Sequence, residues 1–314
     1  MNKIIISEHE GGELANQIWN QVSVLAYALE RNVPCENWSF FEYPGIFKFR
    51  QPNFLVRTLF EPQFRGYTKR KSAFKTRAWR KLYKLLIVMP VRLFSRHILF
   101  SSEAGRDSYD LPPTAPPSLH LQKLEQSRGT VFIANVSGTV FRNRDGIAKH
   151  REKLVALLAP TYEIQTKVNT IFGTARSQYQ HVVGVHIRQG DYKTFKGGRF
   201  AIEQARVREI LGEFLSEKGW QASETQFLIT SDGRIQEDIF SGLNILVSKN
   251  TVGTDIFTLA ACDVIIGSDS TLSHFAAYYG NIPHIIMKKE TMDWEYYKGK
   301  QTYFPNKYLT IMAY

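Results

Sequence analysis

The chain has 314 residues, with 40 Lys and Arg against 29 Asp and Glu, and therefore a formal charge of +11. Eleven of the basic residues fall between Arg65 and Arg96, where no acidic residue occurs, so the rest of the chain carries 29 bases and 29 acids. This distribution argues against a uniformly basic protein that coats nucleic acid. A hydrophobic content of 43% is typical of a globular protein.

The cysteine count and the hydropathy indicate in which cellular compartment the protein is expected. Cys35 and Cys262 are too few for a disulfide framework or a four-thiolate zinc site, and the eight histidines show no metal-ligand spacing, so we predict no metal. No run reaches the about 20 apolar residues that a membrane span needs, and residues 1–10 lack the pattern of a signal peptide. We therefore expect a cytoplasmic protein, with peripheral contact to the inner face of a membrane as a further option.

The first half of the chain predicts one α/β unit. Three isoleucines make Lys3–Ser7 a buried strand, Gly11 and Gly12 interrupt it, and Leu14–Arg31 carries apolar residues at helical spacing. Strand, glycine turn and helix are the opening of an α/β domain. An aromatic-rich stretch (35–64) and the basic segment (65–96) follow, and then a proline-rich stretch (111–118) that cannot lie inside an element. After these we predict a strand at 131–136 and two helices, at 146–159 and 162–172.

The second half alternates strands with helices more regularly, which predicts a parallel sheet covered by helices on both faces. We place a domain boundary near residue 170, giving a first domain of 1–170 with a basic insert at 65–118 and a second domain of 171–314. Thr254 and Asp255 are expected to cap one of the helices. The predicted strands are 181–187, 226–230, 263–267 and 284–287, and the predicted helices are 202–215, 254–261 and 271–279.

Three of these strands end in polar clusters, and ligands of open parallel sheets bind outside the carboxyl ends of the strands. Arg188 follows the strand 181–187, and its guanidinium suits bidentate pairing with a phosphate. Ser231 and Asp232 end the next strand. Residues 268–271, Ser-Asp-Ser-Thr, precede a helix, whose first N–H groups form an anion site. One arginine and a hydroxyl-rich helix N-terminus fit a diphosphate.

Each of these side chains also has a structural interpretation, which the sequence leaves open. Arg188 and Asp191 fit an ion-paired loop, and His186 fits a core histidine bonded to the backbone. Ser231 and Asp232 fit an ordinary cap or turn.

The stretch 186–192, His-Ile-Arg-Gln-Gly-Asp-Tyr, resembles the His-x-Arg-x-Gly-Asp-Tyr signature of the α-1,2-fucosyltransferases, which share a superfamily with α-1,6- and protein O-fucosyltransferases. The stretches 12–19, 227–232 and 255–276 resemble the family's other motifs, in the same order. Four ordered motifs make the resemblance specific. The chain departs from the family pattern at Ala15, in place of glycine, at Asp269, in place of asparagine, and at His274-Phe275, in place of paired tryptophans.

The resemblance implies a GT-B fold, with two Rossmann-like domains that face each other across a cleft. The second domain would bind GDP-fucose and the first would help to bind a glycan acceptor. The implied reaction inverts the anomeric centre without a metal, and the implied linkage is α-1,2 to galactose. A different donor or acceptor on the same scaffold is one rival, and a non-enzymatic protein that binds nucleic acid or membrane is another.

The resemblance also implies roles for individual residues. Arg188 would neutralise the β-phosphate of the departing GDP. Asp263 would accept hydrogen bonds from guanine, with a structural turn residue as the alternative. Asn16 would reach the donor from the first domain, with a simple helix start as the alternative. Asp191 is the favoured base for the acceptor hydroxyl, with Glu13, His9 or no base at all as the alternatives. The expected donor-binding residues are Asn16, His186, Arg188, Ser231, Asp232, Asp263, Ser268, Ser270 and Thr271.

The basic segment has two interpretations. Aromatic and aliphatic residues interleave with cations along 69–98, as in a basic amphipathic helix that lies on an anionic membrane, continuing past a kink at Pro90. A solvated helix or loop is the alternative.

Overall fold

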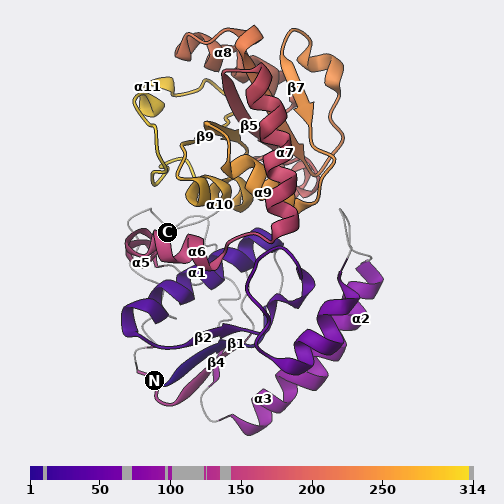
Figure 1. The fold of residues 1–314 in the computed structure, drawn as a ribbon, viewed down its shortest axis with the longest axis vertical. Helices are drawn as coiled ribbons and strands as arrows, with labels where there is room; N and C mark the ends of the chain where they lie inside the picture. Colours follow the sequence, from indigo (N-terminus) through magenta and orange to yellow (C-terminus); the bar gives the residue numbers. More distant parts are fainter. Residues whose placement is uncertain are drawn as a thin grey trace. The chain divides into compact units, whose positions relative to one another are not determined.

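A computed structural model of the chain describes residues 1–9, 13–65, 73–95, 98–100, 124, 126–134 and 143–310. The chain divides into two compact units, the first ending at Thr161 and the second beginning at Tyr162. The sequence-based division after residue 170 falls inside α7 (Tyr162–Gln178), which is one continuous helix that packs against elements of the second unit. Each unit contains one parallel sheet with helices around it (Figure 1).

The sheet of the first unit has the strand order β2-β1-β4-β3, and all of its strands are parallel. Its strands are β1 (Lys3–Ile6), β2 (Cys35–Asn37), β3 (Ile98–Phe100) and β4 (Thr130–Ala134). The three isoleucines of β1 are all buried, as expected for a central parallel strand. The proposed glycine turn at Gly11-Gly12, the end of the strand predicted for 131–136 and the proline-rich stretch 111–118 lie outside the described residues.

Helix α1 (Leu14–Arg31) has the predicted bounds, and Asn32 ends it in the left-handed conformation. The helix predicted for 146–159 is divided at His150 into α5 (Arg144–Lys149) and α6 (Arg151–Leu157). The short 3-10 and π-helical turns of this unit are Phe40–Glu42, Val56–Phe60, Glu61–Gln63 and Lys84–Val88.

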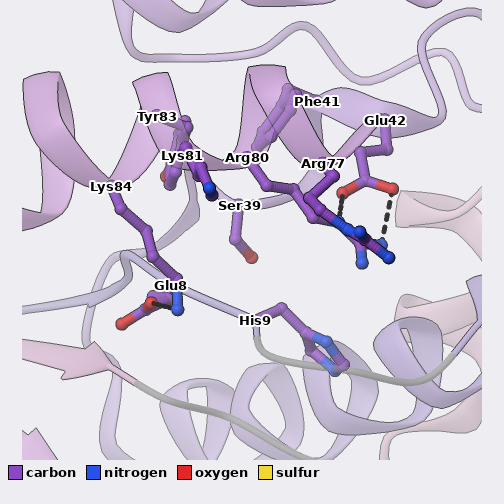
Figure 2. A pocket seen from close by; sticks show the side chains of 10 residues that line it. All are labelled: Glu8, His9, Ser39, Phe41, Glu42, Arg77, Arg80, Lys81, Tyr83 and Lys84. Carbon is purple, nitrogen blue, oxygen red and sulfur yellow. Dashed lines mark hydrogen bonds and ion pairs between the residues drawn. The ribbon is translucent and has the colours of Figure 1, made fainter. Parts of the chain in front are cut away.

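Within the described residues 73–95, the basic segment folds into α2 (Ala73–Tyr83), the π-helical turn η4 (Lys84–Val88) and α3 (Met89–Phe94), while the part of the predicted helix before residue 73 lies outside the described residues. Ile98, which was expected to continue the helix, begins β3 instead. The kink predicted at Pro90 is replaced by a continuous helical path, in which Pro90 lies at the start of α3 directly after the π-helical turn η4. Apolar side chains on one face of this path pack on the aromatic residues that follow β2. Cations on the same path reach carboxylates of the sheet edge, as between Arg80 and Glu42 (Figure 2).

The sheet of the second unit has the strand order β7-β6-β5-β8-β9, again all parallel. Its strands are β5 (His181–Ile187), β6 (Thr225–Ser231), β7 (Asn244–Val247), β8 (Val264–Gly267) and β9 (His284–Ile286). The chain runs outward from β5 in one direction and then returns to β8 on the other side. The gap between β5 and β8 is therefore the topological switch point, where ligands of such sheets bind.

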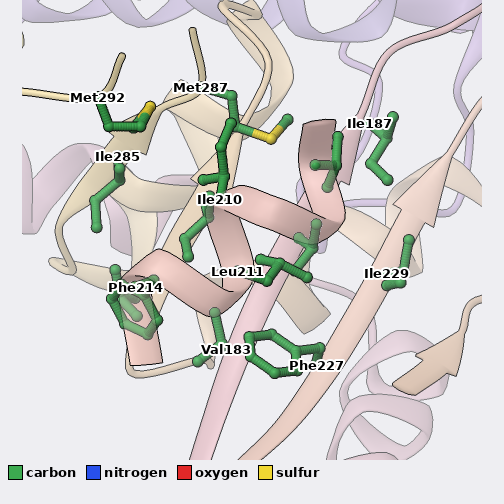
Figure 3. Close-up of a cluster of buried hydrophobic side chains, with 14 of the residues drawn as sticks. Val183, Ile187, Ile210, Leu211, Phe214, Phe227, Ile229, Ile285, Met287 and Met292 are labelled. Atoms are coloured by element: carbon green, nitrogen blue, oxygen red, sulfur yellow. The ribbon is translucent and has the colours of Figure 1, made fainter. Parts of the chain in front are cut away.

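Helices cover both faces of this sheet. Helix α8 (Gln204–Lys218) packs Ile210, Leu211 and Phe214 on side chains of β5, β6 and β9, as Figure 3 shows. The opposite face is covered by α7, α9 (Val252–Ala260) and α10 (Thr271–Gly280). The remaining short elements are Asp191–Lys193, Phe195–Gly198, Ala222–Glu224, Glu237–Phe240 and α11 (Trp294–Tyr297).

Thr251 caps α9 by accepting a hydrogen bond from the N–H of Thr254, so the cap lies three residues before the predicted one. Gly280 lets α10 approach α9 closely, since a Cβ there would lie 1.9 Å from the carbonyl oxygen of Ala260. Among the described residues, no helix combines the length and apolar character that crossing a bilayer requires.

Candidate functional site

The loops that follow β5 and β8 lie on either side of the switch point and are joined to each other. The backbone N–H of Arg188 donates to Ser268 Oγ at 3.0 Å, and the N–H of Ser268 donates to the carbonyl of His186 at 2.9 Å. Ser268 is fully buried, so its hydroxyl serves this junction. The structure thus brings two of the predicted clusters together at one point of the sheet edge.

Arg188 is held beside two carboxylates. Its Nε lies 3.0 Å from Asp191 Oδ1 and 3.2 Å from Asp232 Oδ2, and its guanidinium carbon lies 5.6 Å from the centre of the Tyr192 ring. Burial lowers the pKa of Arg188, but the two carboxylates raise it above its ordinary value, so the side chain stays charged. Its terminal nitrogens donate no hydrogen bond to any described residue. They are available to an anion, in the geometry that a phosphate requires.

Asp232 organises the loop that carries Arg188. Its carboxylate accepts hydrogen bonds from the backbone N–H groups of Gln189 at 2.7 Å and Gly190 at 3.1 Å. Burial raises the pKa of Asp232, but these bonds and Arg188 lower it below its ordinary value. Glycine at position 190 leaves room for this carboxylate, because a Cβ there would lie 2.6 Å from Asp232 Oδ2 and would displace it.

Ser231 has a similar local function. Its Oγ accepts hydrogen bonds from Gln189 Nε2 at 3.1 Å and from the N–H of Gly233 at 3.0 Å. Ser231 and Asp232 therefore lie at the predicted edge of the sheet. Their polar atoms bind the loop of Arg188 and the turn after β6.

His186 is buried one strand position before the edge. Its Nδ1 lies 3.1 Å from Thr230 Oγ1, and Nε2 has no hydrogen-bond partner among the described residues. Burial and the charge of Arg188 lower the pKa of His186 to about 4, so the ring is neutral at pH 7. His186 is therefore not a cation at this edge of the sheet.

The residues after β8 form the start of α10. Ser270 is the N-cap, and its hydroxyl accepts a hydrogen bond from the N–H of Leu272 at 3.3 Å. Thr271 is the first residue of the helix and is 8% exposed. The first N–H groups of the helix and its dipole make this end attractive to anions.

Asp269, one of the departures from the family pattern, has its carboxylate bonded to the backbone. Its Oδ2 accepts a hydrogen bond from the N–H of Thr310 at 3.0 Å and another from the hydroxyl of the same residue. Its carbonyl accepts a hydrogen bond from the Tyr192 hydroxyl at 2.7 Å. The negative charge that the sequence places beside the anion site is thus engaged with Thr310.

A cavity of about 310 Å³ continues the site along the edge, beyond the end of β9. Its lining includes Asp269 together with three cations, Arg199, Lys288 and Lys289, and the ring of Tyr308. Lys288 Nζ lies 3.4 Å from the centre of that ring. The sequence interpretation missed this lining, although the two lysines follow β9 after a single residue, Met287, and the rule used for Arg188 would have found them.

Asp263 does not belong to this site, which corrects the sequence-based expectation. It precedes β8 and so lies at the amino edge of the sheet, where its Oδ2 accepts a hydrogen bond from the N–H of Val182 at 2.8 Å and it pairs with Arg176. Because all strands are parallel, this edge is opposite to the one that carries Arg188. Asp263 therefore has a structural function.

Asn16, Glu13 and His9 belong to the first unit. Asn16 is half-buried in the first turn of α1, and Glu13 accepts a hydrogen bond from the Tyr43 hydroxyl at 3.2 Å. His9 follows β1, and its Nε2 lies 3.1 Å from Asn20 Nδ2. No cluster of three His, Cys, Asp or Glu suited to a metal occurs in the part of the chain that the structure describes.

A guanidinium whose terminal nitrogens donate to none of the described residues, beside a capped helix N-terminus at the switch point of a parallel sheet, is the arrangement of nucleotide-binding α/β proteins. Residues 161–311, which span the whole second unit, match the family model described as Glycosyl transferase family 11. The resemblance to fucosyltransferases that the motifs indicated is thereby confirmed. The comparison with curated protein sequences gives no significant match.

Solved structures share the fold of the chain. POFUT1 in complex with GDP is 12% identical, with a TM-score of 0.50, and the match covers 90% of this chain and 97% of that one. A mutant of Arabidopsis thaliana FUT1 in complex with GDP is 12% identical, with a TM-score of 0.50 and coverages of 92% and 71%. The fucosyltransferase NodZ from Bradyrhizobium is 14% identical, with a TM-score of 0.51 and coverages of 88% and 91%. The expected α/β fold of GT-B type is therefore confirmed.

Proposed function

We propose that the protein is an inverting fucosyltransferase that moves fucose from GDP-fucose to a hydroxyl of an oligosaccharide. The observation that carries the proposal is the pairing of Arg188, whose terminal nitrogens are free of hydrogen bonds to the described residues, with the N-terminus of α10 at the switch point. The family match over the second unit supports glycosyl transfer, and solved structures of the same fold were determined with GDP.

The proposed reaction breaks the bond between the fucose anomeric carbon and the β-phosphate oxygen of the donor. The acceptor oxygen attacks the same carbon from the opposite face, which inverts the configuration, and GDP leaves with the bonding electrons. Arg188 and the first N–H groups of α10 neutralise the charge that grows on the β-phosphate, an effect that is larger in the transition state than in the bound donor. Ser268 and Asp232 keep Arg188 in place for this.

The acceptor hydroxyl must lose its proton in this reaction. We assign the proton to Asp191, whose side chain is 58% exposed at the edge of the sheet and lies 3.0 Å from Arg188 Nε. Glu13 and His9, at the edge of the first unit, are the alternative acceptors of the proton. If Asp191 accepts the proton, Asp191→Asn should lower turnover and remove the acidic limb of the pH–rate profile, whereas a weakened ion pair with Arg188 would lower turnover and leave that limb in place.

The proposed linkage is α-1,2 to galactose, and it rests on the resemblance of 186–192 to the α-1,2-fucosyltransferase signature. Another linkage or donor sugar on the same scaffold is the rival. Incubation with GDP-fucose and a panel of galactosides, followed by linkage analysis of the product, distinguishes the two.

A nucleotide panel tests the donor directly. We expect GDP and GDP-fucose to raise the melting temperature, while UDP and ADP leave it unchanged, because ligands stabilise the state that binds them. We also propose that transfer needs no metal and persists in EDTA. Stabilisation by UDP in place of GDP would contradict the donor assignment, and tight, salt-sensitive RNA binding without GDP affinity would favour the non-enzymatic rival.

We further propose that the outer face of α2–α3 rests on an anionic membrane surface. The supporting observation is a row of exposed apolar side chains beside cations: Leu85 is 61% exposed, Met89 is 45% exposed and Leu93 is 71% exposed. Leu85→Glu should reduce co-sedimentation with vesicles that contain phosphatidylglycerol. Leu157→Glu, at an apolar position of α6 that is 46% exposed, is the matched control, and equal binding of both variants would contradict the proposal.

A further inference from the structure

A cavity also lies in the first unit, at the carboxyl edge of its sheet. Its volume is about 210 Å³, and its lining comes from residues that follow β1 and β2 and from one side of α2 and η4 (Figure 2). This is the edge at which open parallel sheets bind ligands. The volume is below the roughly 300 Å³ at which pockets for drug-sized molecules begin, so it suits a single sugar unit.

The two carboxylates of this cavity are already neutralised. Glu8, which is 2% exposed, lies 3.1 Å from Lys84 Nζ and 3.0 Å from an Arg92 terminal nitrogen. Glu42, which is 5% exposed, accepts a hydrogen bond from a terminal nitrogen of Arg80 at 2.9 Å. An anion that enters the cavity therefore meets no unpaired carboxylate.

Two cations of the lining remain. Arg77 and Lys81 are four residues apart on α2, so they lie on the same side of the helix, and both are exposed. Neither makes an ion pair or hydrogen bond with a described residue. A guanidinium and an ammonium one turn apart form a site for one carboxylate or phosphate.

The wall behind these cations is aromatic. The rings of Phe41 and Tyr83 stack with centroids 4.5 Å apart, and the Tyr83 hydroxyl is engaged with the carbonyl of Ser7 at 2.6 Å. Ser39, another residue of the lining, donates its hydroxyl hydrogen bond to Asn37 Oδ1 at 2.8 Å. The cavity thus combines an apolar surface with two free positive charges, which fits a sugar that carries a negative group.

We infer that this cavity binds the acceptor through an anionic sugar, whose carboxylate or phosphate is held by Arg77 and Lys81. The inference rests on the proposed function, because it identifies the ligand as the glycan that receives fucose. What it adds is the chemical class of that glycan, which carries an anionic sugar.

The test uses the whole protein with its donor site saturated by GDP. Galactose, galacturonate and galactose 6-phosphate are titrated as probes and their binding is followed by ligand-observed NMR. We expect at least one of the two anionic sugars to bind about tenfold more tightly than galactose, and the stronger of the two identifies the charged group as carboxylate or phosphate. Equal affinity for all three sugars, or no binding of any of them, would overturn the inference.

Variants locate the binding. Arg77→Ala and Lys81→Ala should each reduce the affinity for the preferred anionic sugar several-fold, while affinity for GDP stays unchanged. Lys153→Ala, at an exposed lysine of α6 outside the cavity, is the matched control. If all three variants keep the affinity, the anion binds elsewhere and the inference fails. Absence of GDP binding in the same samples would instead contradict the proposed function.

Discussion

The carboxyl edges of the two sheets use arginine and carboxylate in opposite ways. In the second unit one arginine, Arg188, is held by two carboxylates through Nε while its terminal nitrogens stay available. In the first unit, cations of the basic segment neutralise Glu8 and Glu42, which are buried. The carboxylates position the cation in one case, and the cations compensate buried carboxylates in the other.

This difference explains part of the uneven charge of the chain. Arg80, Lys84 and Arg92 of the basic segment each pair with a carboxylate of the sheet edge. They therefore act as structural counter-ions, and nucleic acid is not needed to account for them. Substitution of Arg188 in the second unit should therefore lower the activity. Substitution of the cations that pair with Glu8 in the first unit should lower the free energy of unfolding.

The largest effect is expected from Arg188→Ala. Transfer should fall by at least about a hundredfold, as it does when one preorganised donor to a developing oxyanion is removed. Thermal unfolding should change little, because Asp232 keeps its backbone hydrogen bonds to the loop. Turnover is measured with radiolabelled GDP-fucose.

Arg188→Lys is the control for this prediction. Lysine keeps the charge and loses the planar fork, so an intermediate rate is expected. Near-normal turnover of the alanine variant would contradict the assignment of Arg188 to the β-phosphate.

The next effect is on stability. The double variant Lys84→Ala, Arg92→Ala leaves the buried carboxylate of Glu8 without either cation. We expect the free energy of unfolding of the first unit to fall by about 2–4 kcal/mol, somewhat less than for a fully buried pair, because both cations are partly exposed. Adding Glu8→Gln should restore part of the loss, and urea unfolding measures both. A double variant as stable as the parent would show that these cations do not compensate Glu8.

The sequence was sufficient where a pattern is local. Leu14–Arg31 and His181–Ile187 were predicted with the bounds that the structure has, because each carries a sustained apolar pattern and a clear end. The strands β2, β3 and β7 were missed, because each has only three or four residues. They are defined by parallel pairing with distant strands, which no local pattern reveals.

The candidate site was predictable in position more than in detail. The rule that ligands bind beyond the carboxyl ends of parallel strands located Arg188 and the start of α10. It could not show that Asp232 binds the backbone of residues 189–190, since that contact joins loops about 40 residues apart. The pairing of Glu8 with Lys84 and Arg92 is equally non-local, so the basic segment was interpreted without its counter-ions.

The second unit should also lose stability in acid. Burial lowers the pKa of His186 to about 4 and of His284 to about 3, so both rings are neutral in the fold while the unfolded chain gains protons below about pH 6.5. Between pH 6.5 and about 4 the unfolded state binds more protons, and the free energy of unfolding falls as the pH falls. The slope is at most about 1.4 kcal/mol per pH unit for each histidine.

His284→Leu isolates one of these contributions. Neither ring nitrogen of His284 has a hydrogen-bond partner among the described residues, so leucine removes a titrating group without breaking a bond. Urea unfolding at pH 7 and pH 5 should show a smaller difference for the variant than for the parent. An unchanged difference would assign the acid sensitivity to other groups.

The smallest effect is expected at the amino edge of the second sheet. Asp263→Asn weakens a half-exposed ion pair with Arg176, so the free energy of unfolding should fall by no more than about 1 kcal/mol. Affinity for GDP should be unchanged, because Asp263 and Arg188 lie at opposite ends of parallel strands. Asp232→Asn is the matched variant at the carboxyl edge. It weakens the ion pair with Arg188 and the hydrogen bonds to the Arg188 loop, so it should reduce the affinity for GDP measured by calorimetry. Loss of GDP binding in Asp263→Asn would show that Asp263 contacts guanine. It would contradict the assignment of the nucleotide site to the carboxyl edge of the second sheet.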